Sequence, residues 1–373
     1  MQMRYSKALA LGSAAAIAMG VAACGSSSNN SSSNSSSTGG SSSSSATLNG
    51  AGSTFQAPLV SEWANRFKTS SGTTVNYQPV GSGAGIAQLT AGTVAFAGSD
   101  AVMKPAEVAA GKSKGTPVHV PIALGAVTVS YNLSGVRSGL RLDGPTIADI
   151  FLGRVKKWND QAIASLNPGV SLPSTNITVC HRSDASGTTK NFTAFLVDYS
   201  RAWAAGPGSD KSVQWPTGTG ARGNDGVAGC VKQTPGAVGY VEQAYALQNN
   251  FTTAAVKNKT GAWVEPSLAA TSAAGEGANP PANLEFSTIN ADGARSYPIT
   301  AVTFQIVWQD SCKAGISKAV AGSLKAWLTY ILGDGQKVAP QLQYAALPTA
   351  IQSRAQARVD ALVCNGQPIA AAK

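Results

Sequence analysis

The sequence has few of the residues on which metal sites and hydrolytic centres depend. It contains only two histidines, His119 and His181, and no Cys-x-x-Cys pair. Imidazole and paired thiolates are the usual ligands of zinc, so neither a metal site nor a cofactor is predicted. A nucleophilic serine would have to take its general base from one of the same two histidines. No catalytic residue is therefore assigned from the sequence.

Charged residues are also scarce, at 12% of the chain, and no block of Lys or Arg interrupts it. A nucleic-acid-binding protein typically gathers its positive charge on one stripe, so no nucleic-acid partner is predicted. The formal net charge of +10 instead favours weak attraction toward anions and acidic polymers of the cell envelope. No period of about 20 to 50 residues repeats, which excludes solenoids and propellers.

The N-terminus is typical of an export signal. Arg4 and Lys7 precede an apolar stretch at residues 8–18, and small residues then lead to Cys24 in "VAAC". The apolar stretch is well short of the ~20 residues needed to cross a bilayer. Residues 1–23 are predicted to be a cleaved lipoprotein signal peptide, which leaves Cys24 as the lipidated N-terminus. An ordinary secretory signal with an incidental cysteine is the alternative.

The stretch after Cys24 is a run of Ser, Asn, Thr and Gly with no residue able to bury apolar surface. Residues 24–45 are therefore predicted to be a disordered, flexible tether. About 325 residues remain, enough for two domains of ordinary size. Loss of the signal peptide removes two basic residues, which lowers the formal charge from +10 to +8.

Four cysteines remain in the part of the chain expected to fold, an even number in an exported protein. Disulfides are the expected state in an oxidising compartment. Four cysteines allow three connectivities, and the cysteine count leaves all three open. The cysteines are Cys180, Cys230, Cys312 and Cys364.

Short β-branched or apolar runs alternate with helix-like segments along the chain. Examples are "AVTVSYNL" before "TIADIFLG" and "NITVC" before "TTKNFTAFLV". Strand followed by helix, repeated, predicts an α/β fold with largely parallel sheets. Ser61 and Thr146 are the expected caps of two helices. The low-complexity stretch "EPSLAATSAAGEGANPPANLEF" is expected to be a surface loop.

Three segments share a design in which a strand ends in Gly, Ser or Thr and opens into a helix. They read "LNGAGSTFQAPL", "VGSGAGIAQL" and "VCHRSDASGTTKNFTAFLV". A helix N-terminus exposes unpaired N–H groups with a partial positive charge, so each turn can seat an oxyanion. None has the spacing of a dinucleotide fingerprint or a P-loop. Glycines that serve only turns and caps are the alternative for each segment alone, whereas three such turns with Arg182 favour an anion site.

A serine hydrolase is disfavoured by the residues around these turns. The stretch "SDASGT" has no Gly-x-Ser-x-Gly elbow. Neighbours on a strand point to opposite faces, so His181 faces away from the site if Arg182 faces it. His119 is expected to be a packed or surface residue. Paired carboxylates of the glycosidase kind stay open among the 18 acidic residues, but no segment favours them.

Six segments, taken in order and with their spacing, resemble the phosphate-binding lipoproteins of bacterial high-affinity phosphate ABC importers. They are "GAGSTFQAPL", "VNYQPVGSGAGI", "FAGSDA", "LGRVKKWND", "ITVCHRSDASGTT" and "GNDGVAGCVKQTPGAVGYVE". The resemblance implies a two-lobed, clamshell periplasmic-binding-protein fold of the α/β class with two crossover strands. It places lobe one at residues 46–125 plus 300–373 and lobe two at residues 126–299.

The resemblance also implies a set of phosphate ligands, with Phe55 contributing its backbone N–H. These residues are Thr54, Phe55, Ser82, Asp100, Arg182, Ser186, Gly187 and Thr188. Asp184 corresponds to the acid that pairs with the arginine and orients it. Ala185 and Ser53 depart from a common glycine and a common alanine of the family.

The partners that the resemblance implies are inorganic phosphate and the permease subunits of the importer. Through its lipid, the protein would be anchored to the cell membrane on the extracytoplasmic face. It is expected to be a monomer and not an enzyme. Two lobes that move about crossover strands also imply a disulfide pairing, because a bridge between them would lock the hinge. Cys180–Cys230 and Cys312–Cys364, each inside one lobe, are the expected pairs.

Asp100 is the residue expected to distinguish between anions. At neutral pH phosphate keeps a proton that a buried carboxylate can accept, whereas sulfate has none. The alternative is that Asp100 caps the helix-like "AVMKPAEVAAGK". Two other functions stay open: a surface phosphohydrolase that uses Ser186 or Ser82, and a surface lipoprotein that binds another oxyanion or serves adhesion or signalling.

Overall fold

The computed structural model describes residues 47–370. The predicted signal peptide, the lipidation site at Cys24 and the tether up to residue 45 lie outside the described residues. Within residues 47–370, no helix combines the length and the apolar character that a membrane crossing requires.

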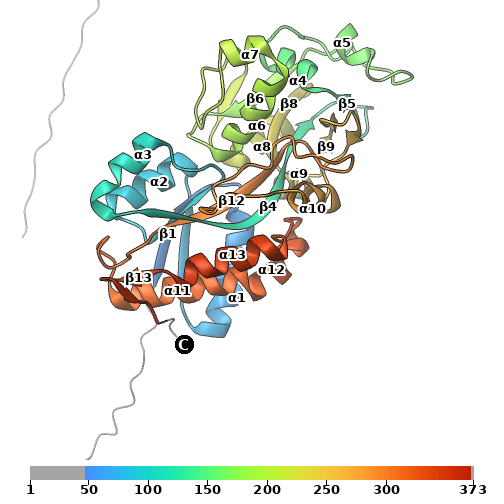
Figure 1. The fold of residues 1–373 in the computed structure, drawn as a ribbon. Helices are drawn as coiled ribbons and strands as arrows, with labels where there is room; N and C mark the ends of the chain where they lie inside the picture. Colours follow the sequence, from blue (N-terminus) through green and yellow to red (C-terminus); the bar gives the residue numbers. More distant parts are fainter. Residues whose placement is uncertain (1–46, 371–373) are drawn as a thin grey trace, which may run out of the picture. The chain divides into compact units, whose positions relative to one another are not determined.

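Strands and helices alternate along the described chain, as the α/β prediction requires (Figure 1). The strands are β1 (Leu48–Gly52), β2 (Val75–Pro79), β3 (Phe96–Ser99), β4 (Pro117–Tyr131), β5 (Arg141–Leu142), β6 (Thr178–Arg182), β7 (Thr219–Ala221), β8 (Ala237–Glu242), β9 (Thr252–Thr253), β10 (Ala255–Lys257), β11 (Trp263–Val264), β12 (Thr300–Trp308), β13 (Val363–Cys364) and β14 (Gln367–Pro368). The α-helices are α1 (Ala57–Ser71), α2 (Ser82–Ala91), α3 (Pro105–Ala110), α4 (Gly144–Phe151), α5 (Gln161–Ala164), α6 (Gly187–Tyr199), α7 (Arg201–Ala205), α8 (Gly223–Gln233), α9 (Gln243–Gln248), α10 (Leu268–Glu276), α11 (Lys318–Leu332), α12 (Asp334–Val338) and α13 (Thr349–Asp360). Two 3₁₀ turns, η1 (Lys112–Lys114) and η2 (Ala339–Leu342), complete the set of described elements.

One nine-stranded sheet carries most of the strands, in the order β2-β1-β3-β12-β4-β8-β6-β7, with β9 beside β4. The strands β2, β1 and β3 run parallel to one another, as do β8, β6 and β7. The two strands between these groups, β12 and β4, are antiparallel to their neighbours. The parallel prediction is therefore correct on each side of the sheet and wrong at its centre.

Strand β4 connects the two parallel groups. Its first part pairs with β12, from Pro117 opposite Trp308 to Ala126 opposite Thr300. Its last part, from Val127 to Tyr131, pairs with β8 instead. Figure 1 shows β4 and β12 running side by side along this path. The predicted lobe boundaries fall inside β4 and at the first residue of β12, which is where two crossover strands would lie.

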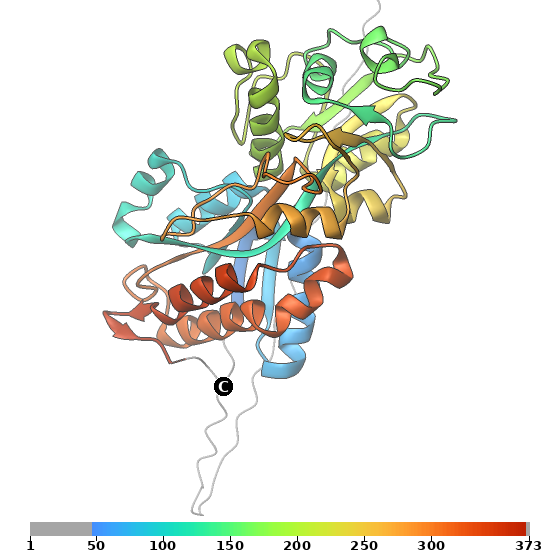
Figure 2. The same cartoon turned by 45° about the vertical axis from the view of Figure 1, so that its right-hand side comes forward.

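Alternation along the strands sends side chains into separate apolar clusters on the two faces of the sheet. On β3, Phe96 joins the large cluster that includes Trp63 of α1 and Trp327 of α11. Its neighbour Ala97 joins a smaller cluster with Ile86 of α2. Figures 1 and 2 show the same arrangement, with α1 and α11 on one side of β1–β3 and α2 on the other. This double cover of a parallel sheet follows from strands that are buried on both faces.

Two cap predictions are wrong because the helices begin elsewhere. Helix α1 starts at Ala57 with a proline in its first turn, so Ser61 lies inside the helix. Thr146 lies inside α4, where its N–H donates to the carboxylate of Asp143, the actual cap, at 3.0 Å.

The low-complexity stretch is not purely a surface loop. It contains α10, whose first turn is capped by Ser267 and which buries Thr271 and Ala274. Alanine has the highest helix propensity, which outweighs the low sequence complexity of this stretch.

Both expected disulfides are present. Cys180 of β6 is bonded to Cys230 of α8, across a sequence separation of 50 residues. Cys312 in the loop after β12 is bonded to Cys364 of β13, across 52 residues. The first bridge fixes the packing of α8 against β6, the strand that ends in Arg182.

Candidate functional site

Arg182 is the last residue of β6, and its side chain is paired with Asp184. The guanidinium is almost completely buried, and its Nε and Nη2 donate to the two carboxylate oxygens of Asp184 at 2.7 and 2.5 Å. The backbone N–H of Gly223 donates to the same carboxylate at 3.1 Å. Burial raises the pKa of Asp184, but the hydrogen bonds and charge of Arg182 outweigh burial and hold it below its usual value. Asp184 therefore orients the arginine as an ion.

The pairing with Asp184 leaves one edge of the guanidinium available. Arginine carries five N–H donors, and Asp184 takes those on the Nε side. The Nη1 group on the other edge lies 3.4 Å from the hydroxyl of Thr188. The Nη1–Nη2 edge can thus grip two oxygens of a tetrahedral anion while the Nε edge stays fixed.

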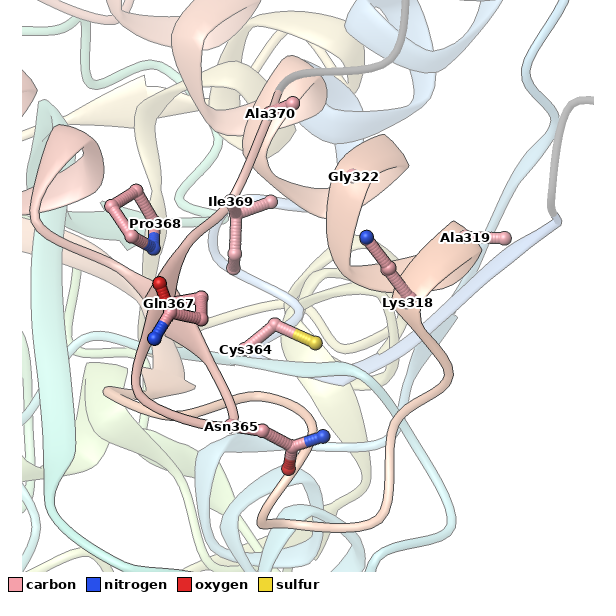
Figure 3. A pocket seen from close by; sticks show the side chains of 9 residues that line it. All are labelled: Lys318, Ala319, Gly322, Cys364, Asn365, Gln367, Pro368, Ile369 and Ala370. Atoms are coloured by element: carbon pink, nitrogen blue, oxygen red, sulfur yellow. The ribbon is translucent and has the colours of Figure 1, made fainter.

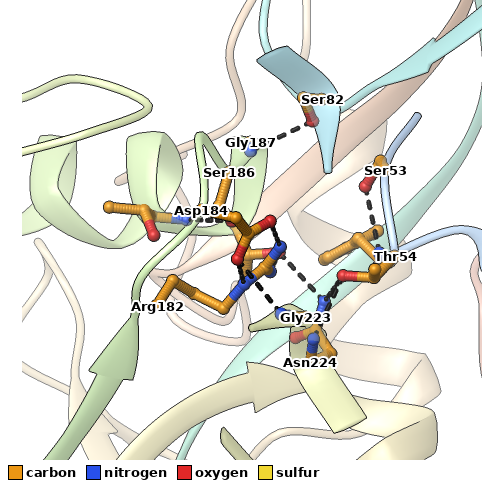
Figure 4. Close-up of polar contacts among 12 residues, drawn as sticks. Ser53, Thr54, Ser82, Arg182, Asp184, Ser186, Gly187, Gly223 and Asn224 are labelled. Atoms are coloured by element: carbon orange, nitrogen blue, oxygen red, sulfur yellow. Dashed lines mark hydrogen bonds and ion pairs between the residues drawn. The ribbon is translucent and has the colours of Figure 1, made fainter. Parts of the chain in front are cut away.

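The N-terminus of α6 follows directly after this pair. Ser186 is its N-cap, and the Ser186 hydroxyl accepts a hydrogen bond from Thr189 N–H at 3.1 Å. The N–H of Gly187 donates to the hydroxyl of Ser82, the first residue of α2, at 3.0 Å. Two of the three glycine-rich helix starts singled out in the sequence therefore meet here, and Figure 4 shows them facing each other.

Asp100 lies just beyond the end of β3 and is 2% exposed. Its carboxylate accepts hydrogen bonds from the hydroxyls of Ser53, at 2.5 Å, and Thr303, at 2.7 Å. Burial raises the pKa of Asp100 to about 6, although the hydroxyl donors and the charge of Arg182 lower it in part. The capping alternative is wrong, because α3 begins at Pro105 and is capped at Lys104.

Asp100 and the start of α6 are in close contact. A β-carbon placed on Gly187 would lie 2.6 Å from Asp100 Oδ2 and 2.6 Å from Ser82 Oγ, so only glycine fits there. The N–H of Gly83 also donates to the carbonyl of Ala185 at 2.9 Å. The residues proposed from the resemblance thus come from distant segments and lie together.

The first glycine-rich turn, before α1, reaches the same place. The Thr54 hydroxyl accepts two hydrogen bonds from Asn224, one from the backbone N–H at 3.1 Å and one from the side chain at 2.9 Å. Phe55 is fully buried, and its backbone N–H donates to the Ser53 hydroxyl at 3.0 Å. The hydrogen bonds and close contacts therefore bring all eight sequence-predicted ligands into one region, although the Phe55 N–H predicted to bind phosphate is bonded to Ser53. Figure 4 shows Thr54, Ser82, Ser186 and Gly187 there, with Asp184 beside Arg182.

Sequence reasoning did not identify four residues of this network as site residues: Ser53, Thr303, Gly223 and Asn224. Asn224 had a usable signal, since "ARGNDGVAGC" is a further glycine-containing helix start. Ser53 was noted only as a departure from the family pattern. Thr303 had none, because it lies on β12 and meets Asp100 across a separation of 203 residues.

The histidines do not supply a base to either serine. The ring of His181 stacks on Trp215 with centroids 4.6 Å apart, and its Nδ1 lies 3.1 Å from the carbonyl of Arg182. His119 is buried and its Nε2 accepts the N–H of Met103 at 3.0 Å. Over residues 47–370, no group of three or more His, Cys, Asp or Glu side chains is arranged to hold a metal ion.

A hollow elsewhere on the described chain belongs to α11 and the β13–β14 hairpin (Figure 3). It contains none of the predicted ligands. Its lining residues are Lys318, Ala319, Gly322, Cys364, Asn365, Gln367, Pro368, Ile369 and Ala370.

Comparison with known proteins gives the family of this chain. A family model described as a PBP superfamily domain matches residues 37–335. The phosphate-binding protein PstS of Xylella fastidiosa is 42% identical over 304 residues, which cover 81% of this chain and 81% of that protein. The chain belongs to the PstS-type family of phosphate-binding proteins.

Solved structures confirm the fold expected of this family. A high affinity periplasmic phosphate-binding protein, solved with bound phosphate, superposes with a TM-score of 0.68 at 21% identity, over 84% of this chain and 93% of that one. A phosphate binding protein from Stenotrophomonas maltophilia superposes with a TM-score of 0.64 at 21% identity, over 84% and 93% of the two chains. At this identity the likeness shows the fold, and the PstS-type chain has the predicted two-lobed periplasmic-binding-protein architecture.

Proposed function

We propose that this protein binds inorganic phosphate outside the cytoplasmic membrane and delivers it to an ABC-type phosphate permease. The observation that carries the proposal is the meeting of one buried cation, one helix N-terminus and one buried acid. Arg182 and the N-terminus of α6 supply hydrogen-bond donors, and Asp100 supplies an acceptor next to Gly187. A partly protonated tetrahedral anion needs both kinds of group: donors for its oxygens and an acceptor for its proton.

Most of the anion's charge is balanced by dipoles rather than by full charges. Asp184 already neutralises Arg182, so the pair offers the anion directed hydrogen bonds and adds no net charge. The first turn of α6 contributes a partial positive charge, while its Gly187 and Thr189 N–H groups are bonded to the hydroxyls of Ser82 and Ser186. The hydroxyls of Thr54, Ser82 and Thr188 can add further donors.

Asp100 gives the site its preference for phosphate over sulfate. Each hydroxyl that bonds Asp100 already accepts one N–H bond, Ser53 from Phe55 at 3.0 Å and Thr303 from Gln56 at 2.8 Å. Their protons therefore point at the carboxylate, which stays an acceptor. The proton of phosphate satisfies that acceptor, whereas sulfate brings only a second negative charge.

A role in binding rather than catalysis agrees with the relatives, which are named as binding proteins. The phosphohydrolase alternative lacks a base, because the Ser186 hydroxyl caps α6 and His181 is stacked on Trp215. A phosphomonoester assay should detect no turnover.

The anchoring part of the proposal rests on the sequence alone. Cleavage before Cys24 and lipidation of that cysteine would attach the protein to the extracytoplasmic face of the cell membrane. Cys24→Ala should abolish incorporation of a fatty-acid label into the protein. Labelling of the variant at the wild-type level would contradict the lipid anchor. The lobe boundaries at 125/126 and 299/300, the permease partner and the monomeric state also belong to this proposal.

The function is tested by titration of the folded part, residues 46–373, after removal of bound anion. Phosphate should bind with micromolar or tighter affinity, and sulfate should bind far more weakly. Arsenate and molybdate extend the comparison to other tetrahedral oxyanions. Failure to detect phosphate binding by calorimetry would favour the adhesion or signalling alternative, and preference for another anion would favour the alternative oxyanion.

A further inference from the structure

Asn224, the second residue of α8, joins two of the predicted ligands. Its side chain is fully buried, and its Nδ2 donates to Thr54 Oγ1 at 2.9 Å and to Thr188 Oγ1 at 3.2 Å. Its backbone N–H donates to Thr54 Oγ1 as well, at 3.1 Å. One amide therefore contacts a hydroxyl that precedes α1 and a hydroxyl in the first turn of α6.

The orientation of this amide is set by β8. The Oδ1 of Asn224 accepts the backbone N–H of Glu242 at 3.0 Å. A backbone N–H can only donate, so the amide oxygen must face Glu242 and the NH₂ group must face the two threonines.

Counting lone pairs then gives the direction of each threonine hydroxyl. A hydroxyl has two acceptor sites and one proton. Thr54 Oγ1 receives two N–H bonds from Asn224. Thr188 Oγ1 receives one from Asn224 and a longer one from Arg182 Nη1, at 3.4 Å. With both acceptor sites occupied, each hydroxyl can interact with a bound ligand only as a donor.

We propose that Asn224 is a positioning residue that makes Thr54 and Thr188 obligate donors to the anion, so that neither hydroxyl can accept the phosphate proton. The inference rests on the proposed phosphate site and adds to it a rule for the orientation of the ligand. A phosphate proton that points at either threonine would place two hydrogens against each other, because the acceptor sites of both hydroxyls are occupied. The protonated oxygen of phosphate is thereby directed to the carboxylate of Asp100.

A double-mutant cycle in the mature protein tests this mechanism, with inorganic phosphate as the titrant. Asn224→Ala should weaken phosphate binding by about 10- to 100-fold, the range for hydrogen bonds to a charged partner. If Asn224 acts through the threonines, the same substitution in a Thr54→Val background should cost at least about threefold less. Equal factors in the two backgrounds would overturn the proposal.

Asn224→Asp reverses the hydrogen bonds to the threonines and also adds a negative charge that repels the anion, so its effect is compared between the wild-type and Thr54→Val backgrounds. This variant keeps an oxygen for Glu242 N–H but offers an acceptor to the threonines, whose protons would then turn away from the ligand. Phosphate affinity should fall further than in Asn224→Ala. Equal or tighter binding by Asn224→Asp would contradict the proposal, even if Asn224→Ala does not fold.

Asn167 provides the matched control. It is also a buried amide, whose oxygen accepts Arg141 N–H at 2.8 Å and whose nitrogen donates to Arg141 O and Ile163 O, both at 2.9 Å. Asn167→Ala should lower the melting temperature without changing phosphate affinity. If wild-type protein binds no phosphate, the proposed function fails; if wild type binds and the cycle is additive, only the role of Asn224 fails.

Discussion

Replacement of Asp100 by Asn should weaken phosphate binding and stabilise the ligand-free protein at the same time. The substitution keeps the shape of the side chain and removes its charge. In the bound state it replaces an ionised acceptor of the phosphate proton with an amide that can also donate. A hydrogen bond with one charged partner contributes about 1.5 to 3 kcal/mol, so phosphate affinity should fall by about 10- to 150-fold.

The gain in stability follows from the burial of Asp100. Its pKa rises from 3.8 to about 6 on folding, mainly because burial disfavours the charged form. A difference of roughly two pKa units corresponds to about 3 kcal/mol of unfavourable free energy at neutral pH. Asn carries no charge and avoids this cost. One of the two hydroxyl donors, Ser53 or Thr303, must rotate to accept from the new NH₂ group, which lowers the gain in stability by about 1 kcal/mol. A net gain of about 2 kcal/mol is expected.

The hydroxyl rearrangement is present with and without ligand, so it cancels in the binding free energy and appears only in stability. Sulfate should therefore bind Asp100→Asn as well as wild type or better, since the repulsion from a second anion is gone. Calorimetric titration of both proteins with both anions, at fixed ionic strength, measures the affinities. Urea unfolding of the stripped proteins measures the stability.

Two results would refute this reasoning. Equal weakening of phosphate and sulfate, or of neither, would show that Asp100 does not discriminate between them. Loss of stability in the ligand-free variant would show that the hydroxyl bonds of the carboxylate outweigh the cost of burying its charge.

Three further predictions concern pH, the disulfides and the glycine at the start of α6. The folded pKa of Asp100 lies above its unfolded value, so the protonated carboxyl adds to the free energy of unfolding below about pH 4. This contribution is lost as the pH rises through about 6. The stability of Asp100→Asn minus that of wild type, from urea unfolding, should thus grow between pH 4 and 7; a constant difference would contradict the raised pKa. Removal of the Cys180–Cys230 bridge by paired alanine substitution should lower the free energy of unfolding by about 4 kcal/mol. It should also weaken phosphate binding, because this bridge joins β6 to α8. Removal of the Cys312–Cys364 bridge should lower stability alone. Gly187→Ala should weaken phosphate binding at least about tenfold, since its β-carbon would lie 2.6 Å from two site oxygens, whereas Gly229→Ala, with open space around it, should bind normally; equal affinities would exclude the close approach.

Local patterns in the chain were enough to predict the α/β fold, the glycine-rich turns that open into helices and the presence of disulfides. These features depend on short-range physics: strand and helix periodicity, the free N–H groups of a helix start, and an even cysteine count in an exported chain. The starts of α2 and α6 were recognisable because a glycine and a serine stand side by side at each of them, Gly81–Ser82 and Ser186–Gly187. The individual ligands and the disulfide pairing came from the family resemblance.

Helix starts were less predictable, because several residues near a helix end can serve as its cap. Ser61 is a good capping residue, but Pro58 allows α1 to begin one turn earlier. Thr146 is likewise preceded by Asp143, whose carboxylate accepts its N–H. The competition between neighbouring caps is decided by how the whole helix packs, which a local pattern does not contain.

The polar network around Asp100 and Asn224 was decided by tertiary structure. Thr303 donates to Asp100 from a strand 203 residues away, and Asn224 meets Thr54 across 170 residues. The glycine-containing helix start marks Asn224 locally, but nothing local shows that it meets Thr54, and a threonine on a strand is an ordinary residue. Their roles arise only when β12 and α8 bring them against β3 and the turn before α1. Burial then matters as much as contact, since the pKa of Asp100 rises to about 6 only because the surrounding segments exclude water from it.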